Sequence, residues 1–138
     1  MSVRRSRRFC RGLALLAGLV TTAAPAADAL VVLTVDVEYL ESGMPLYAAI
    51  ATQAERAQQG VESTRRSEIE LARDLRQSEV LTALPEAISE VALAANADLV
   101  LDREVAQRVG ASAADDVTEE VERILVSQFS QLPLEPGT

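Results

Sequence analysis

Residues 97–125 read ADLVLDREVAQRVGASAADDVTEEVERIL, and this stretch decides the fold. The apolar run at its start predicts a strand over residues 97–102, followed by a polar turn at Arg103 and Glu104. Alternating apolar and polar residues then predict a short edge strand over residues 105–109. The segment therefore predicts two strands at the carboxyl-terminal side of the domain.

The end of the same stretch carries a helix start signal. After a predicted loop, Asp116 stands at the expected N-cap and Glu119 three residues later, a variant of the capping box. One face of the predicted helix comprises Val117, Val121, Ile124, Leu125 and Gln128. We expect this helix to close the fold.

A second apolar run, LVVLTVDVE at residues 30–38, predicts the first strand. Its continuous start is typical of a strand buried on both faces, and its alternating end of one buried on a single face. Asp36 and Glu38 would then share one face. That pair is either a solvated strand end, the interpretation we favour, or part of an acidic site.

The residues between the two strands have the composition of helices. Pro45 fits the first turn of a helix. A thin apolar stripe predicts two helices that pair side by side, joined at a tip between Gly60 and Gln77. Symmetry and the polar run VESTRRSE favour a tip near residues 65–68, with arms of about 25 residues each.

The returning helix has a clearer apolar stripe, formed by Leu84, Ala87, Ile88, Val91 and Ala95. We expect this part to pack on the sheet. Pro85 should kink the helix or start a new one there. Asn96 is the expected carboxyl-terminal cap.

Residues 1–26 have the pattern of a cleavable export signal. Five arginines precede a short apolar run, and small residues at Ala24 and Ala26 form a cleavage pattern. We expect cleavage after Ala26, with cleavage after Ala29 or an uncleaved anchor as alternatives. Sec export is favoured, because the residues after Arg7 and Arg8 fit a twin-arginine signal poorly.

Composition excludes several classes of function. Beyond the expected signal, the chain holds 8 arginines and 21 acidic residues, a net charge of −13. Such a surface repels nucleic acid and anionic lipid. The chain has neither His nor Lys, and its one cysteine, Cys10, lies in the expected signal. We therefore expect no catalytic residue, no cofactor and no metal, and not an enzyme.

One enzymatic alternative remains, a carboxylate or metal-dependent site built from Asp36, Glu38, Asp98 or Asp102. Asp98 and Asp102 bracket the predicted second strand, and this separation argues against one shared site.

The exported start, LVVLTVDVEYL and DLVLDREVAQRVGASAADDVTEEVERIL together resemble the Skp/OmpH family of periplasmic chaperones. The matching parts cover about half of the chain after the signal, including an Asp-hydrophobic-Thr motif at Asp116, Val117 and Thr118. The resemblance implies an α+β fold, a small β head of three short strands plus a carboxyl-terminal helix, with a projecting coiled-coil-like helical hairpin. Residues 27–138 would form one domain, with the head at 27–44 and 96–132 and the hairpin at 45–95.

The resemblance also implies a function. Family members are homotrimers whose helices enclose a cavity, and they hold unfolded outer-membrane proteins in the periplasm without ATP. Client-facing residues would be Ile50, Ala54, Ala57, Val61, Ile69, Ala72 and Leu75, which otherwise only pair the two helices. The trimer head and its core would comprise Val32, Leu33, Val35, Leu99, Val100, Leu101, Val117, Val121 and Ile124.

This chain departs from the family in two respects. Its helical part is short, and it is acidic without any Lys, whereas well-known members are basic. If it holds clients, we expect them to be smaller or basic. The alternative is a periplasmic structural or interaction module that keeps the trimeric head and has lost general client holding.

Overall fold

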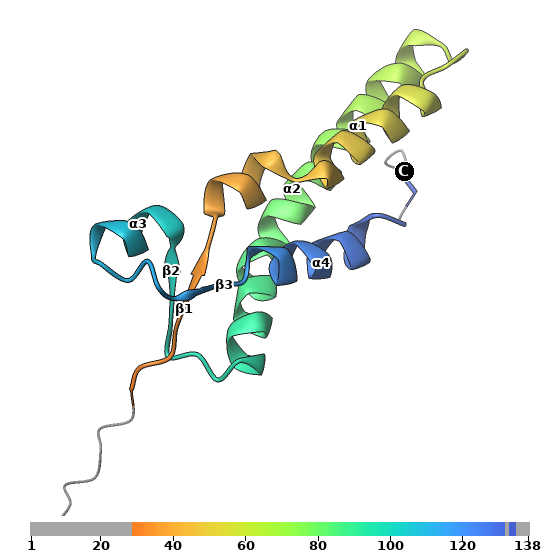
Figure 1. Ribbon diagram of the computed structural model, residues 1–138. Helices are drawn as coiled ribbons and strands as arrows, with labels where there is room; N and C mark the ends of the chain where they lie inside the picture. The colour runs from red at the N-terminus through yellow and green to blue at the C-terminus, as the bar shows by residue number, and fades with distance from the viewer. Residues whose placement is uncertain (1–28, 132, 135–138) are drawn as a thin grey trace, which may run out of the picture.

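A computed structural model describes residues 29–131 and 133–134, and the predicted signal peptide lies outside these residues. The chain is a mixed α and β fold, as predicted (Figure 1). Its elements in chain order are β1 (Val32–Val35), a π-helical turn η1 (Tyr39–Gly43), α1 (Pro45–Ala57), α2 (Ser63–Ala94), β2 (Leu99–Asp102), α3 (Arg103–Arg108), β3 (Asp115–Asp116) and α4 (Thr118–Phe129).

The three strands form one parallel sheet in the order β2-β1-β3. In the central strand, Leu33 pairs with Val100 on one side and with Asp115 on the other. Parallel neighbours cannot be joined by a tight turn, so the chain must cross over between them. The helices α1 and α2 provide the crossover from β1 to β2, and α3 lies in the crossover from β2 to β3.

The two apolar runs form β1 and β2, as their patterns predicted. The residues predicted for the head and its core differ in exposure. Leu33, Val35 and Val121 are buried; Val32, Val100, Leu101, Val117 and Ile124 are half-buried; Leu99 is exposed on the edge strand. The sheet is therefore covered unevenly, with its central strand best protected.

The predicted edge strand over residues 105–109 is wrong, because α3 occupies this region. The side chain of Asp102 caps α3 by accepting a hydrogen bond of 2.9 Å from the backbone N–H of Glu104. Ala106 is the buried residue of this helix. Gly110, at φ +77°, then ends it with the left-handed turn that favours glycine.

The third strand lies instead at Asp115–Asp116, inside the segment predicted to be a loop and cap. The helix α4 begins two residues after the predicted N-cap, at Thr118. The carboxylate of Asp116 still accepts a hydrogen bond of 2.9 Å from the backbone N–H of Thr118. Asp116 therefore serves both the end of the sheet and the start of α4.

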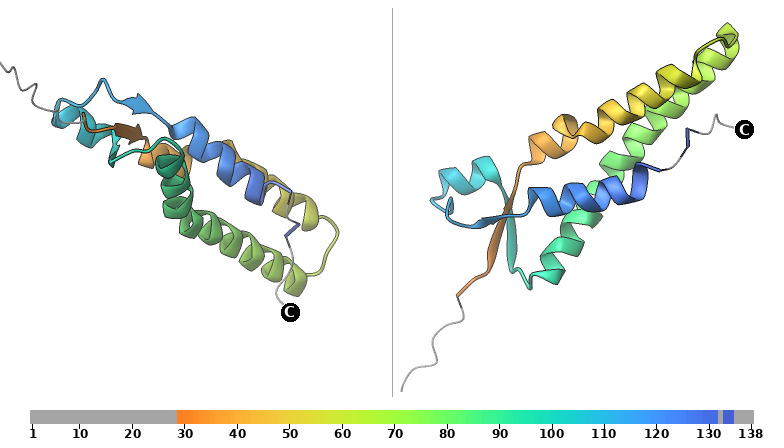
Figure 2. Two further views of the ribbon diagram at one scale, coloured as in Figure 1. Left: turned by 90° about the horizontal axis from the view of Figure 1, so that it is seen from below. Right: turned by 45° about the vertical axis from the view of Figure 1, so that its right-hand side comes forward.

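The helices α1 and α2 run side by side and are joined by residues 58–62 (Figures 1 and 2). Gly60 in this turn has φ +74°. The turn therefore lies at the early edge of the predicted range, and the tip favoured near residues 65–68 is wrong, because those residues belong to α2. The arms are unequal, with 13 residues in α1 and 32 in α2.

The second helix continues through Pro85 without starting anew. At its end Asn96 has φ +50°, and its N–H donates to the carbonyl oxygen of Leu93 at 3.1 Å. The N–H of Ala97 donates to the carbonyl oxygen of Ala92 at 2.9 Å. This pair of bonds is a Schellman motif, which confirms Asn96 as the capping position.

The helix α4 packs across the carboxyl-terminal half of α2, and the core lies between them and η1. The side chains of Leu40, Val80, Val121 and Leu125 are completely buried there. None of the described helices is long and apolar enough to cross a membrane.

Candidate functional site

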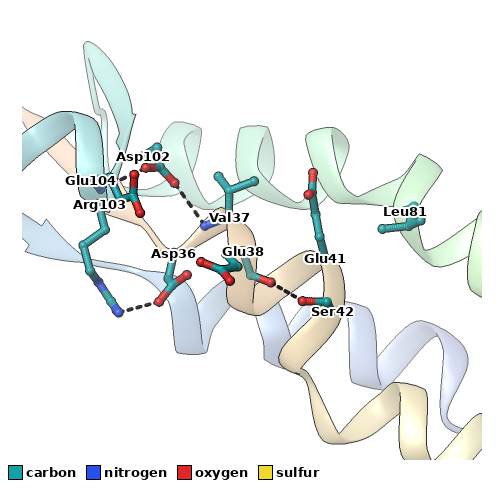
Figure 3. Close-up of a pocket in the computed structure, with 9 residues that line it drawn as sticks. All are labelled: Asp36, Val37, Glu38, Glu41, Ser42, Leu81, Asp102, Arg103 and Glu104. Carbon is teal, nitrogen blue, oxygen red and sulfur yellow. Dashed lines mark hydrogen bonds and ion pairs between the residues drawn. The ribbon is translucent and has the colours of Figure 1, made fainter.

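Parallel strands place their carboxyl ends at one edge of a sheet, where ligands of such sheets commonly bind. Here that edge carries a cleft of about 910 Å³ (Figure 3). Most of its lining is acidic or polar: Asp36, Val37, Glu38, Glu41, Ser42, Leu81, Asp102, Arg103 and Glu104. The cleft therefore gathers residues from the segment that directly follows β1 and from η1, α2, β2 and α3.

Arg103 bridges the segment that follows the central strand β1 and the end of the edge strand β3. Its guanidinium donates to the Asp36 carboxylate at 2.5 Å and to the Asp116 carboxylate at 2.6 Å. The hydrogen bond to Asp116 and the nearby negative charges raise the pKa of Arg103. The cation stays charged and holds the ends of β1 and β3 together.

Asp116 is stabilised in its ionised form. Burial raises the pKa of its carboxyl group, but hydrogen bonds from Thr118 and Arg103 outweigh burial and bring the pKa below the usual value for aspartate. This carboxylate is engaged on both oxygens, by the Thr118 N–H and by Arg103. It is a structural anion that fixes the start of α4.

The two aspartates that line the cleft, Asp36 and Asp102, bind backbone N–H groups. Asp36 accepts a hydrogen bond of 2.9 Å from the N–H of Tyr39. Asp102 accepts from the N–H of Val37 at 3.3 Å, in addition to its bond with Glu104. These carboxylates therefore hold together the turns that follow β1 and β2.

The fold brings together three of the four acidic residues considered for a carboxylate or metal-dependent site. Asp36, Glu38 and Asp102 line the cleft. Asp98 lies at the opposite end of β2, where it accepts a hydrogen bond of 2.8 Å from the N–H of Val31. Asp36 and Glu38 do not share a strand face, because β1 ends at Val35 and the chain turns helical. The described residues contain no group of three or more side chains placed to hold a metal ion.

The predicted client-facing residues lie on the helical hairpin. Ile50, Ala54, Ile69 and Ala72 are buried, Val61 is half-buried, and Ala57 and Leu75 are exposed. The four buried side chains lie where α1 contacts α2. In this chain the stripe mainly pairs the two helices, and Leu75 is its one large exposed member.

Sequence reasoning missed several exposed apolar side chains. Leu71 and Leu81 lie on α2 and are 58% and 43% exposed. Further exposed apolar residues lie before β1, on the edge strand β2, and on or just after α3: Leu30, Val31, Leu99, Val105 and Val109. The spacing of Leu71 and Leu75 by one helical turn could have indicated a shared face.

Comparisons of the chain with known protein families, with curated proteins and with solved structures found no match.

Proposed function

We propose that the protein is a periplasmic, ATP-independent holding chaperone that binds unfolded outer-membrane proteins as a homotrimer. The observation that carries this proposal is the helical hairpin inserted between two adjacent parallel strands. Residues 45–94 leave the sheet from β1 and return to β2 beside it. This insertion supports the proposal that α1 and α2 act as a short projecting tentacle, as the resemblance to the Skp/OmpH family implies.

The head offers a surface for self-association. The strand β2 is an edge strand, and Leu99 on it is 47% exposed. Leu30, Val31, Val105 and Val109 add exposed apolar area on the neighbouring segments. Exposed apolar residues that adjoin an open sheet edge favour association with another chain. We propose that three copies associate through this head.

Clients would contact apolar side chains of the hairpin that remain exposed, with Leu75 as the member of the predicted stripe best placed to do so. Holding of this kind needs no nucleotide and no reactive residue, since mobile helices shield apolar segments from one another. Export to the periplasm rests on the signal-like residues 1–26.

The experiment is an aggregation assay combined with a measurement of molar mass. A denatured β-barrel membrane protein is diluted into buffer with the purified protein, and light scattering reports aggregation. We expect a trimer that suppresses scattering at about one trimer per client. A stable monomer, or a trimer that leaves scattering unchanged, contradicts the proposal.

A second candidate function is a structural or interaction module that keeps the trimeric head. The burial of Ile50, Ala54, Ile69 and Ala72 between α1 and α2 favours it, because these side chains are not available to a client. An intact trimer without holding activity supports this module and contradicts the chaperone.

A further inference from the structure

The outer face of α2 is a row of residues that point away from the rest of the chain. It comprises Ser67, Leu71, Leu75, Ser78 and Thr82, which recur at three- or four-residue spacing. Leu71 and the completely buried Val80 are separated by about two and a half helical turns, which puts them on opposite sides of α2. Leu71 and Leu75 are 58% and 52% exposed. The row therefore has no partner within the described chain.

Two of the three polar members of this row, Ser67 and Thr82, make side-chain hydrogen bonds to their own helix. The hydroxyl of Thr82 donates to the carbonyl oxygen of Ser78 at 2.8 Å, and that of Ser67 donates to the carbonyl oxygen of Ser63 at 3.3 Å. Both donors are thereby occupied. The outer face can accordingly be covered by an apolar surface without leaving these hydroxyl protons unpaired.

Small residues beside the two leucines leave shallow, open hollows on the same face. One hollow of about 480 Å³ is lined by Ser63, Thr64, Ser67, Glu68 and Leu71. The other, of about 340 Å³, is lined by Leu75, Ser78, Glu79, Thr82, Ala83 and Glu86. Helices pack when the side chains of one enter the spaces between side chains of the other. The alternation of leucines and hollows is suited to a partner helix.

The charge around the outer face selects the partner. Residues 67–86 contain five acidic residues and two arginines, a net charge of −3. The two arginines pair with Asp74 and Glu79. Glu70 and Glu86 make no ion pair within the part of the chain that the structure describes. A second copy of this face would bring like charges together, and a cationic partner would bring opposite charges.

We propose that the outer face of α2 docks a basic amphipathic helix of another protein. Apolar side chains of the partner enter the two hollows and cover Leu71 and Leu75. Its Lys or Arg side chains meet the acidic rim at Glu70 and Glu86. This goes beyond the proposed function, because a folded partner helix can dock here whether or not the protein holds unfolded clients.

The test uses three synthetic 18-residue peptides labelled with a fluorophore. One has Leu on one helical face and Lys on the other, one has Leu and Glu, and one has Gln and Lys. Fluorescence anisotropy with the purified protein should show saturable binding of the Leu and Lys peptide only, weakened by added salt. Equal binding of the Gln and Lys peptide would reduce the interaction to charge alone and overturn the proposal, as would no binding of the Leu and Lys peptide.

Variants locate the binding site. Leu71→Ser with Leu75→Ser should weaken binding about tenfold or more, because two leucines lose their apolar contact. Glu70→Gln with Glu86→Gln should weaken it less and reduce its salt dependence. Leu93→Ser is the matched control, since Leu93 is 78% exposed in the last turn of the same helix. Circular dichroism checks that each variant is folded.

Unchanged binding in the double leucine variant, or an equal loss in Leu93→Ser, would overturn the proposed site. Failure of the peptide to bind while client aggregation is still suppressed would reject the docking surface alone. Peptide binding without suppression would reject the chaperone alone.

Discussion

The hydroxyl oxygen of Thr118 accepts a hydrogen bond of 2.9 Å from the backbone N–H of Asp36, across 82 residues of sequence. Thr118 is the first residue of α4, and Asp36 directly follows β1. The N–H of Val117 also donates to the carbonyl oxygen of Thr34 at 2.9 Å. These two bonds fasten the closing helix to the end of the central strand, so the Asp-hydrophobic-Thr motif has a structural role here.

Removal of the Thr118 hydroxyl should destabilise the fold. Thr118 is buried, so Thr118→Val leaves the N–H of Asp36 without its partner, at a cost of about 1–3 kcal/mol. Urea unfolding followed by circular dichroism measures this loss. Thr118→Ser keeps a hydroxyl and should retain most of the stability. Equal losses in the two variants would show that the hydrogen bond contributes little.

Stability in acid should depend on Asp116. Its pKa in the folded chain lies below the value of about 3.9 for an unperturbed aspartate, so its ionised form stabilises the fold. This contribution is complete above the unfolded pKa, and it is lost as the pH falls below about 4 through the folded pKa. Asp116→Asn should therefore be less stable at pH 7 and lose less stability in acid than the unmodified protein.

The matched control for that variant is Asp115→Asn. The side chain of Asp115 makes no hydrogen bond or ion pair within the described residues. Urea unfolding between pH 7 and pH 2.5 should give the same profile for this control as for the unmodified protein. An Asp116→Asn profile parallel to that of the unmodified protein would contradict the role of the carboxylate.

The apolar runs predicted β1 and β2 because a short continuous apolar run bounded by polar or turn residues is typical of a strand. They did not predict α3. Over six residues, alternation of Val105 and Gln107 with their neighbours fits a strand or a helix equally well. The parallel direction of the sheet favours the helix, because the chain must cross over after Asp102 before it can form β3. The parallel direction also brings Asp36 and Asp102 to the same edge of the sheet. No local sequence pattern indicates the relative direction of two strands.

The hairpin tip was misplaced for a related reason. The prediction assumed two helices of equal length that pack only against each other. The second helix contacts α4 as well as α1, so it has a second partner that the prediction did not consider. The turn consequently contains Gly60, the first residue of the predicted range, where a positive φ favours glycine.

Replacement of Gly110 should destabilise the fold through the backbone alone. Its φ is +77°, and a Cβ added there would meet nothing within 4 Å. Gly110→Ala should therefore cost roughly 1–2 kcal/mol, the strain of a left-handed conformation in a residue with a Cβ. Thermal unfolding measures the loss. Ser112→Ala, at a nearby exposed position, should change stability by less than about 0.5 kcal/mol. Equal effects of the two substitutions would contradict this explanation.

The predicted client-facing residues of α1 and α2 should divide into buried residues that stabilise the fold and exposed residues that are available for other contacts. Ile50 is 3% exposed between the helices, so Ile50→Ala should cost about 2–5 kcal/mol through lost packing and a cavity. Leu75 is 52% exposed, so Leu75→Ala should change stability by about 0.5 kcal/mol or less. Urea unfolding measures both values. If Leu75 contacts clients, Leu75→Ala should also weaken suppression of client aggregation although the fold is intact. A stability loss as large as that of Ile50→Ala would contradict this division, because it would place Leu75 in a contact that stabilises the protein itself.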